Sequence, residues 1–171
     1  MKPKIRTTIT YSIIAIALAI SHGTVTALAG QAPDRSLGGV WLVTITPRNC
    51  AAGAPTTAAF EALFTFHNDG TMLVSLRNSS LTLDRTAAHG LWGREHGWNQ
   101  YSFKFIHIRR EVSTGAFAGK QESDGTLVLS DSGDEFTTDG STRGFDVNGN
   151  PGTGGCSTSA GTRFQLKLRR R

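Results

Sequence analysis

The densest group of side chains that could do chemistry lies in the ten-residue segment 89–98. It holds two histidines, His89 and His96, one carboxylate, Glu95, and two tryptophans, which are residue types that bind a metal ion or stack on a planar ligand. On a strand, side chains alternate between two faces, so His96 points away from His89 and Glu95 unless the strand bulges. We therefore predict no metal site here, with Trp92 packed inside and the histidines at strand ends.

The other polar motifs do not form a catalytic arrangement. The sequence has no Gly-x-Ser-x-Gly motif that would present a serine nucleophile. His67 and Asp69 fall in a turn, where a side-chain contact with the backbone is the simpler role. The run Asp146–Asn150 imitates the start of a calcium loop, but Pro151 and Ser157 stand where glycine and glutamate are needed. We predict no catalytic residue, no metal ligand and no cofactor, and keep an enzyme as an alternative.

A set of aromatic residues could form the wall of a pocket for an apolar ligand. If apolar and polar positions alternate, these rings share one face of their strands and point inward. Pockets for small molecules are mostly hydrophobic, but the same rings also fill a small barrel, and an eight-stranded barrel has room for either arrangement. A packed core is our first interpretation, and a ligand-lining wall is the second. The candidate lining residues are Phe60, Phe64, Phe66, Trp92, Tyr101, Phe103 and Phe105.

Short strands separated by turn residues must position these side chains. Apolar and alternating runs predict strands at Gly39–Thr46, Phe60–Phe66, Thr71–Leu76, His89–Glu95, Asn99–Arg109, Gly115–Gln121, Thr126–Ser130, Glu135–Val147 and Thr162–Leu168. Asn68–Gly70 and Ser123–Gly125 are predicted as turns because each contains Asp-Gly. Arg77–Ala88 is predicted as a polar loop, and Gly152–Gly161 as a Gly/Ser/Thr-rich connection. Short strands at this spacing indicate an all-β antiparallel barrel or sandwich.

The two cysteines favour a barrel. Cys50 follows the first predicted strand and Cys156 precedes the last. Two cysteines form a disulfide in an oxidising compartment, and the signal-peptide features of residues 1–29, described below, direct the chain to one. The bridge places the first and last strands side by side, which closes an antiparallel up-and-down barrel of eight to nine strands. If the two cysteines are taken as directly opposite residues, Trp41 lies opposite Gln165. We expect the true pairing to differ from this register by one residue, because Pro47 interrupts the ladder of hydrogen bonds.

The first 29 residues have the order of a signal peptide. Three cations precede the apolar run Ile13–Ile20, and Ala27-Leu28-Ala29 supplies the small residues of a cleavage site before Gly30. The apolar run is shorter than the roughly 20 residues that cross a bilayer, and no later run approaches that length. We predict a signal peptide at residues 1–29 and one β-barrel domain at 30–171, periplasmic or secreted, with no membrane span in the mature chain.

Removing the signal segment changes the charge balance. The chain carries eighteen Lys and Arg against thirteen Asp and Glu, but three of the cations lie in the signal segment, which leaves a net charge of +2. Three more cations form the C-terminal run Arg169–Arg171, and the others are scattered along strands and loops. Nucleic-acid binding needs cations gathered on one face, so we predict no nucleic-acid partner.

Residues at both ends of the predicted barrel resemble a known superfamily. Gly39-Val40-Trp41 at the start of the first strand, with Arg163 late in the chain, is similar to the pattern of lipocalin-like, or calycin, β-barrels. The resemblance implies structural roles, with Trp41 packed across the closed end of the barrel and Arg163 over its ring. The second and third lipocalin motifs are absent, so the resemblance brings no ligand with it.

The mature chain also resembles a group of small exported bacterial proteins of unestablished activity. The shared features are the Thr-x-x-Pro-Arg-Asn-Cys pattern of Thr44–Cys50 and the turn at Phe145–Asn150, which precedes a late cysteine. This resemblance implies a lipocalin-like barrel located outside the cytoplasm. It implies no reaction.

Three functions fit such a barrel. The leading hypothesis is a protein that holds a small hydrophobic or aromatic ligand at one open end. The second is a protein-binding barrel, such as a secreted protease inhibitor, that uses its loops and the N-terminal arm Gly30–Leu37. The third is a barrel enzyme acting on an apolar substrate. An interior void lined by aromatics favours the ligand, a filled interior beside an exposed apolar patch favours the partner, and a charged residue or histidine inside the void favours the enzyme.

Overall fold

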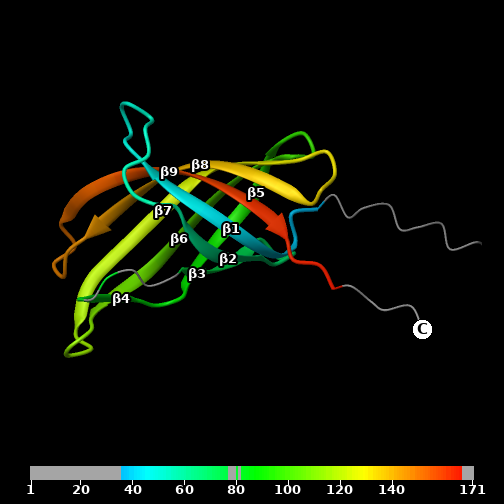
Figure 1. Ribbon diagram of the computed structural model, residues 1–171. Helices are drawn as coiled ribbons and strands as arrows, with labels where there is room; N and C mark the ends of the chain where they lie inside the picture. The colour runs from blue at the N-terminus through cyan, green and yellow to red at the C-terminus, as the bar shows by residue number, and fades with distance from the viewer. Residues whose placement is uncertain (1–35, 77–79, 81, 167–171) are drawn as a thin grey trace, which may run out of the picture. The chain divides into compact units, whose positions relative to one another are not determined.

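A computed structural model describes residues 36–76, 80 and 82–166 of the chain (Figure 1). All of these residues belong to one unit, Pro33–Arg171. The predicted signal peptide at residues 1–29 and the cationic run Arg169–Arg171 lie outside the described residues.

Every regular element in the described residues is a β-strand. The strands are β1 (Gly39–Arg48), β2 (Phe60–Phe66), β3 (Thr71–Leu76), β4 (Leu83–Arg85), β5 (Ala88–His96), β6 (Gln100–Glu111), β7 (Phe117–Leu129), β8 (Glu135–Phe145) and β9 (Pro151–Arg163). The all-β class is therefore confirmed. The short strand β4 was not predicted, because it lies in the stretch Arg77–Ala88 that was assigned to a polar loop.

The strands close into a barrel. Neighbours pair antiparallel in the order β1, β2, β3, β5, β6, β7, β8 and β9, and β9 returns to β1. Strand β4 pairs with β6 beyond the end of β5. The described residues thus form a closed antiparallel barrel of eight strands with one extra strand, which confirms the predicted architecture.

Alternation decides which side chains enter the barrel. In β2, Ala62, Phe64 and Phe66 are buried, whereas Glu61 and Leu63, which alternate with them, are exposed. Strand β6 follows the same pattern, since every second residue from Tyr101 to His107 is buried. The turn between β2 and β3 is also where the sequence predicts it, with Gly70 at φ 85°.

The last strand differs from the prediction. The Gly/Ser/Thr-rich stretch that was predicted as a connection is itself strand β9. This strand ends at Arg163, whereas the closing strand was predicted to run from Thr162 to Leu168. In that predicted strand, alternation would turn Phe164, Leu166 and Leu168 toward the interior, but Phe164 and Leu166 are 73% and 82% exposed, and Leu168 lies outside the described residues. Strand propensity is weak for glycine and serine, but β9 lies between β1 and β8 and pairs with both, and this pairing overrides the propensity (Figure 1).

The disulfide is present, but it does not set the register. Cys50 and Cys156 are bonded across a sequence separation of 106 residues. Cys156 lies inside β9 opposite Arg48, so the ladder runs without a break from Trp41↔Arg163 to Arg48↔Cys156, through Pro47. The disulfide taken as a register sets Trp41 opposite Gln165, but Trp41 pairs with Arg163. The difference is two residues and not the one residue expected, because Cys50 lies in the loop after β1.

The predicted turn at Ser123–Gly125 is also wrong, because β7 continues through it. A methyl group at position 125 would lie 2.5 Å from the carbonyl oxygen of Asp139 and 2.8 Å from the Cα of Gly140. It would also lie 2.9 Å from the Cζ atom of Phe103, the register partner of Gly125 on β6. Glycine is needed at position 125 because β7 and β8 approach closely there, and not because the chain turns.

One end of the barrel is closed by a tryptophan under an arginine. Trp41 is fully buried, and its Nε1 donates a hydrogen bond to the carbonyl oxygen of Leu37 at 3.0 Å. The guanidinium of Arg163 lies 4.3 Å from the centroid of the Trp41 ring. Its nitrogens donate to the carbonyl oxygens of Ser36, Gly38 and Gly133 at 2.6–3.0 Å. The arginine thereby joins the N-terminal segment, the β7–β8 turn and the end of β9.

Replacing Trp41 with alanine should lower the free energy of unfolding by about 3–5 kcal/mol, because the ring is fully buried and its loss leaves a cavity. The matched control is Leu42→Ala on the outer face of the same strand, where the side chain is 47% exposed and a change under about 1 kcal/mol is expected. Denaturant unfolding of both variants measures the difference in stability. A loss under about 1 kcal/mol for Trp41→Ala contradicts the packing of Trp41 as a buried side chain that closes this end of the barrel.

The variant Gly125→Ala should lower the free energy of unfolding by about 1–3 kcal/mol, because the added methyl group overpacks the space between β7 and β8. Gly93→Ala is the control, since a methyl group there meets nothing within 4 Å. Equal unfolding midpoints for the two variants would show that the close approach at Gly125 is not a packing constraint.

Candidate ligand-binding cavity

The half of the barrel away from Trp41 contains a cavity of about 770 Å³. Its apolar wall comes from β1, β2, β3 and β6, and it consists of Ile45, Phe60, Phe64, Leu76, Phe103 and Phe105. The exposed loop residues Thr56–Ala59 line it too, so the cavity reaches the surface at this loop. A space of this size lies within the roughly 300–1,000 Å³ of small-molecule sites.

Four of the seven aromatic candidates line this cavity, namely Phe60, Phe64, Phe103 and Phe105. The other three, Phe66, Trp92 and Tyr101, pack together outside it. The Trp92 ring lies 5.8 Å from Phe66 and 5.7 Å from Tyr101 between centroids, and its Nε1 donates to the carbonyl oxygens of His67 and Thr71. The two interpretations of the aromatic set therefore apply to different halves of the barrel, one packed and one open.

The opposite wall of the cavity is polar. Strands β7, β8 and β9 contribute Gln121, Ser123, Thr138, Thr142, Ser157 and Ser159. Three of these side chains are joined: Gln121 Nε2 donates to Thr142 Oγ1 at 2.7 Å, and the hydroxyls of Ser123 and Thr142 lie 2.9 Å apart. Thr142 in turn donates to the carbonyl oxygen of Glu122 at 3.0 Å. Half of this wall was not predicted, because Ser123 was assigned to a turn and Ser157 and Ser159 to a connection between strands.

Cationic and imidazole groups gather at the same end of the barrel. Arg85 on β4 lines the cavity, and it pairs in register with Arg109 on β6. Burial lowers the pKa of Arg85, and the charge of Arg109 lowers it further. His107, only 1% exposed, shares its strand face with Arg109, and its Nε2 lies 3.2 Å from Gln121 Oε1. Burial is the main cause that lowers the pKa of His107; Arg85 and Arg109 act in the same direction, and the Gln121 contact opposes them.

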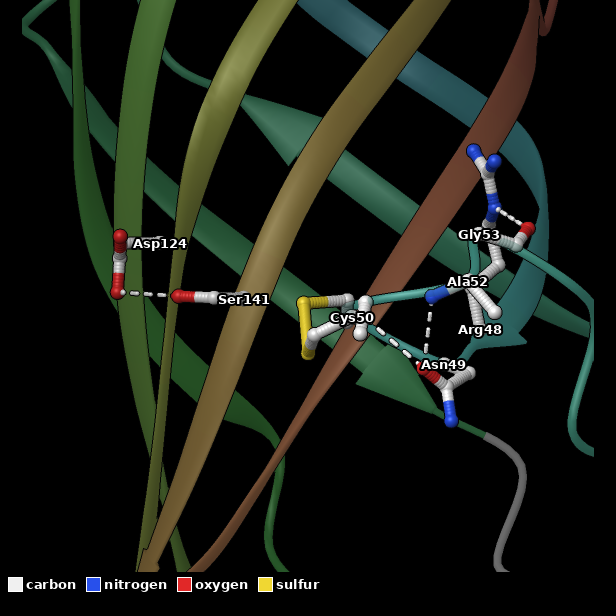
Figure 2. The surroundings of a disulfide bond; sticks show 9 residues. Arg48, Asn49, Cys50, Ala52, Gly53, Asp124 and Ser141 are labelled. Atoms are coloured by element: carbon white, nitrogen blue, oxygen red, sulfur yellow. Dashed lines mark hydrogen bonds between the residues drawn. A yellow bond between two sulfur atoms is a disulfide. The ribbon is translucent and has the colours of Figure 1, made fainter.

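The loop beside the cavity is held at several points (Figure 2). Cys50 anchors it to Cys156, and Asn49 Oδ1 accepts hydrogen bonds from the backbone N–H groups of Ala51 and Ala52, both at 2.9 Å. Arg48 Nε donates to the carbonyl oxygen of Gly53 at 2.6 Å. The disulfide therefore fixes the loop that leads to Thr56–Ala59, while the β1–β9 ladder closes the barrel.

The structure does not assemble a metal site from the residues weighed in the sequence. His89, Glu95 and His96 are exposed on β5, where the register shifts between Arg94 and His96. Within residues 36–76, 80 and 82–166, no group of three or more His, Cys, Asp or Glu side chains could hold a metal ion.

The two acidic turns have structural contacts. Asp69 Oδ1 accepts from the N–H and the hydroxyl of Thr71, and these hydrogen bonds lower the pKa of Asp69. Asp146 Oδ1 accepts from the N–H groups of Asn148 and Asn150, while its Oδ2 accepts from the Asn150 side chain. The Asn150 contacts are the main cause of a lowered pKa for Asp146. Both carboxylates stabilise turns.

Comparisons with known proteins add no family. No protein-family model matches this chain, and no curated protein is significantly similar to it. Over the part of the chain that the structure describes, no helix is long and apolar enough to cross a membrane.

We expect the pKa of His107 to lie below its ordinary value of 6.5, because burial disfavours the imidazolium. Just below pH 6.5 this histidine is protonated in the unfolded chain but still neutral in the folded chain. The free energy of unfolding should therefore fall as the pH drops below about 6.5. Below the folded-state pKa the loss levels off. An NMR titration of the His107 ring measures the pKa, and denaturant unfolding between about pH 7 and pH 5 measures the stability.

The control for this effect is His107→Gln, which keeps a polar side chain but cannot titrate. This variant should lose the part of the pH dependence between pH 6.5 and the folded-state pKa of His107. A His107 ring that titrates at or above 6.5 would contradict the effect of burial.

Proposed function

We propose that this protein is an exported, lipocalin-like barrel that binds a small molecule with an apolar or aromatic body. The observation that carries the proposal is the cavity of about 770 Å³, with phenylalanines on one wall and hydroxyl and amide groups on the other. An apolar body loses its hydration against the rings, and the polar wall orients it through a few hydrogen bonds.

Two features support the exported location. The Cys50–Cys156 disulfide is stable in an oxidising compartment and rare in the cytoplasm. The first 29 residues have the charge, apolar run and small residues of a signal peptide. The lipocalin-like assignment is supported by Gly39-Val40-Trp41 on the first strand and by the stacking of Arg163 on Trp41.

A second function, binding of a protein partner, has one observation in its favour. On the outer face of β1 and β2, Leu42 and Leu63 are register partners and are each 47% exposed, with Val40 beside them at 37%. Exposed apolar patches mark interaction surfaces. The filled interior that was expected to accompany such a function is absent from the cavity half of the barrel, so the ligand proposal has the stronger support.

The enzyme alternative has weaker support. Arg85 does reach the cavity, but a guanidinium stays protonated at neutral pH and does not exchange protons with a substrate. The carboxylate of Asp124, whose residue also lines the cavity, accepts a hydrogen bond from Ser141 on the outer face of the strands (Figure 2). A substrate in the cavity would meet hydroxyls, rings and the permanently charged Arg85, which suits binding.

The proposal is tested by filling the cavity. The wild-type protein should bind one equivalent of a neutral apolar dye such as Nile red, and Ser159→Trp should weaken this binding about tenfold or more, because the new ring occupies the cavity. Ala160→Trp is the matched control, since its side chain lies on the opposite, exposed face of β9 and should leave the affinity unchanged.

Fluorescence titration gives both affinities, and native mass spectrometry of protein purified from its own host detects a retained ligand. The proposal fails if the wild-type barrel binds no neutral probe, or if both tryptophan variants bind it as the wild type does.

A further inference from the structure

The cavity end of the barrel carries positive charge without a matching carboxylate. Arg85 and Arg109 are register partners on β4 and β6, so their side chains leave the same face of the sheet. Within the described residues, the ion pairs are Lys104–Glu122, Lys120–Glu122 and Arg163–Asp134, and none of them includes Arg85 or Arg109. Two partly buried guanidiniums therefore face each other without an acidic partner.

Two acids on the neighbouring strand β7 have other partners. Glu122 binds Lys104 and Lys120, and it alternates with the inward-facing Gln121 and Ser123, which places it on the outer face of β7. Asp124 accepts from Ser141. These two carboxylates do not pair with the arginines, so an anion that enters the cavity meets a positive charge that they do not neutralise.

Hydrogen-bonding capacity is unused at the same place. The Nε atom of Arg109 is buried and has no partner, although its Nη2 donates to the carbonyl oxygen of Phe145 at 2.6 Å. The Nδ1 atom of His107, on the same face two residues before Arg109, is also buried without a partner. Buried polar groups are almost always satisfied, and leaving them unpaired costs free energy. Neither Arg109 nor His107 is among the residues that line the cavity, so these atoms lie beside the site, and Arg85 is the cation that a ligand can reach.

We propose that Arg85, with Arg109 beside it, binds the anionic head of the cavity ligand. The inference rests on the proposed ligand-binding function and adds the chemical class: an amphipathic anion with an apolar body and a carboxylate or phosphate head. Arg85 lines the cavity together with Phe103 and Phe105, so one molecule can place its body on the rings and its head on the guanidinium. Guanidinium pairs with these oxyanions through two parallel hydrogen bonds.

Three probes of equal chain length separate the head group from the body: dodecanol, dodecanoic acid and dodecyl phosphate, each displacing Nile red from the wild-type protein. At least one of the two anions should bind about 10- to 100-fold more tightly than the alcohol, as expected for hydrogen bonds to a charged group. The anion with the higher affinity identifies the head.

The variant Arg85→Met should remove this preference, so that neither anion binds more tightly than dodecanol does to the same variant. Arg110→Met is the matched control, because Arg110 is the exposed neighbour of Arg109 on the opposite face of β6. It should keep the preference of the wild type. The melting temperature of ligand-free Arg85→Met should equal or exceed that of the wild type, because the variant removes a charge that has no acidic partner.

The possible failures are distinct. If no probe binds, the ligand-binding function itself fails. If dodecanol binds as tightly as both anions, or if Arg85→Met keeps the preference for the anion, the ligand-binding function stands and the anion site is overturned. A marked loss of stability in ligand-free Arg85→Met would also overturn it, since the arginine would then be structural.

Discussion

Pairing of the first strand with the last is the constraint on which the rest of the structure depends. The ladder from Trp41↔Arg163 to Arg48↔Cys156 turns an open sheet into a closed wall. It brings the guanidinium of Arg163 over the Trp41 ring at one end of the barrel and brings Cys156 within reach of Cys50 at the other. The closed end, the cavity and the loop beside it all follow from this single register.

The two halves of the barrel differ because the inward side chains differ in size. Near Trp41 the interior receives Phe66, Met72, Leu127 and Phe136, which are almost fully buried. In the other half, β7, β8 and β9 send in mainly serine, threonine, glycine and glutamine, which are too small to meet the phenylalanines of β2 and β6. The aromatic residues lie mostly on one side of the barrel, and the space that the other side leaves unfilled is the cavity.

The sequence predicts those parts of the fold where local pattern and tertiary pairing agree. Strands β2 and β6 have clear apolar alternation, and the Asp-Gly turn at Gly70 has the positive φ that the dipeptide suggests. The same dipeptide at Gly125 misleads, because that glycine is required by the closeness of Gly140 and not by a turn. Strand β9 is missed because its small polar residues have low strand propensity until two neighbouring strands pair with them.

The candidate site is only half visible from the sequence for the same reason. The phenylalanine wall follows from alternation, whereas Ser123, Ser157 and Ser159 of the polar wall lie on the misassigned parts of β7 and β9. Small and polar residues do recur at every second position on both strands, but a search for alternating hydrophobic residues does not find such a pattern. The positions are Gln121, Ser123 and Gly125 on β7, and Ser157, Ser159 and Gly161 on β9. Arg85 could not be found, because its position opposite Arg109 depends on the pairing of β4 with β6.

The late position of β9 also determines when folding can finish. Hairpins from β1 to β3 and from β5 to β8 form between neighbours in the chain, but the wall stays open until Pro151–Arg163 has been synthesised. Until then β1 and β8 have unpaired edges, which invite association with other chains. A gene product that stops before these last thirteen strand residues is therefore an aggregation-prone open sheet and not a smaller barrel.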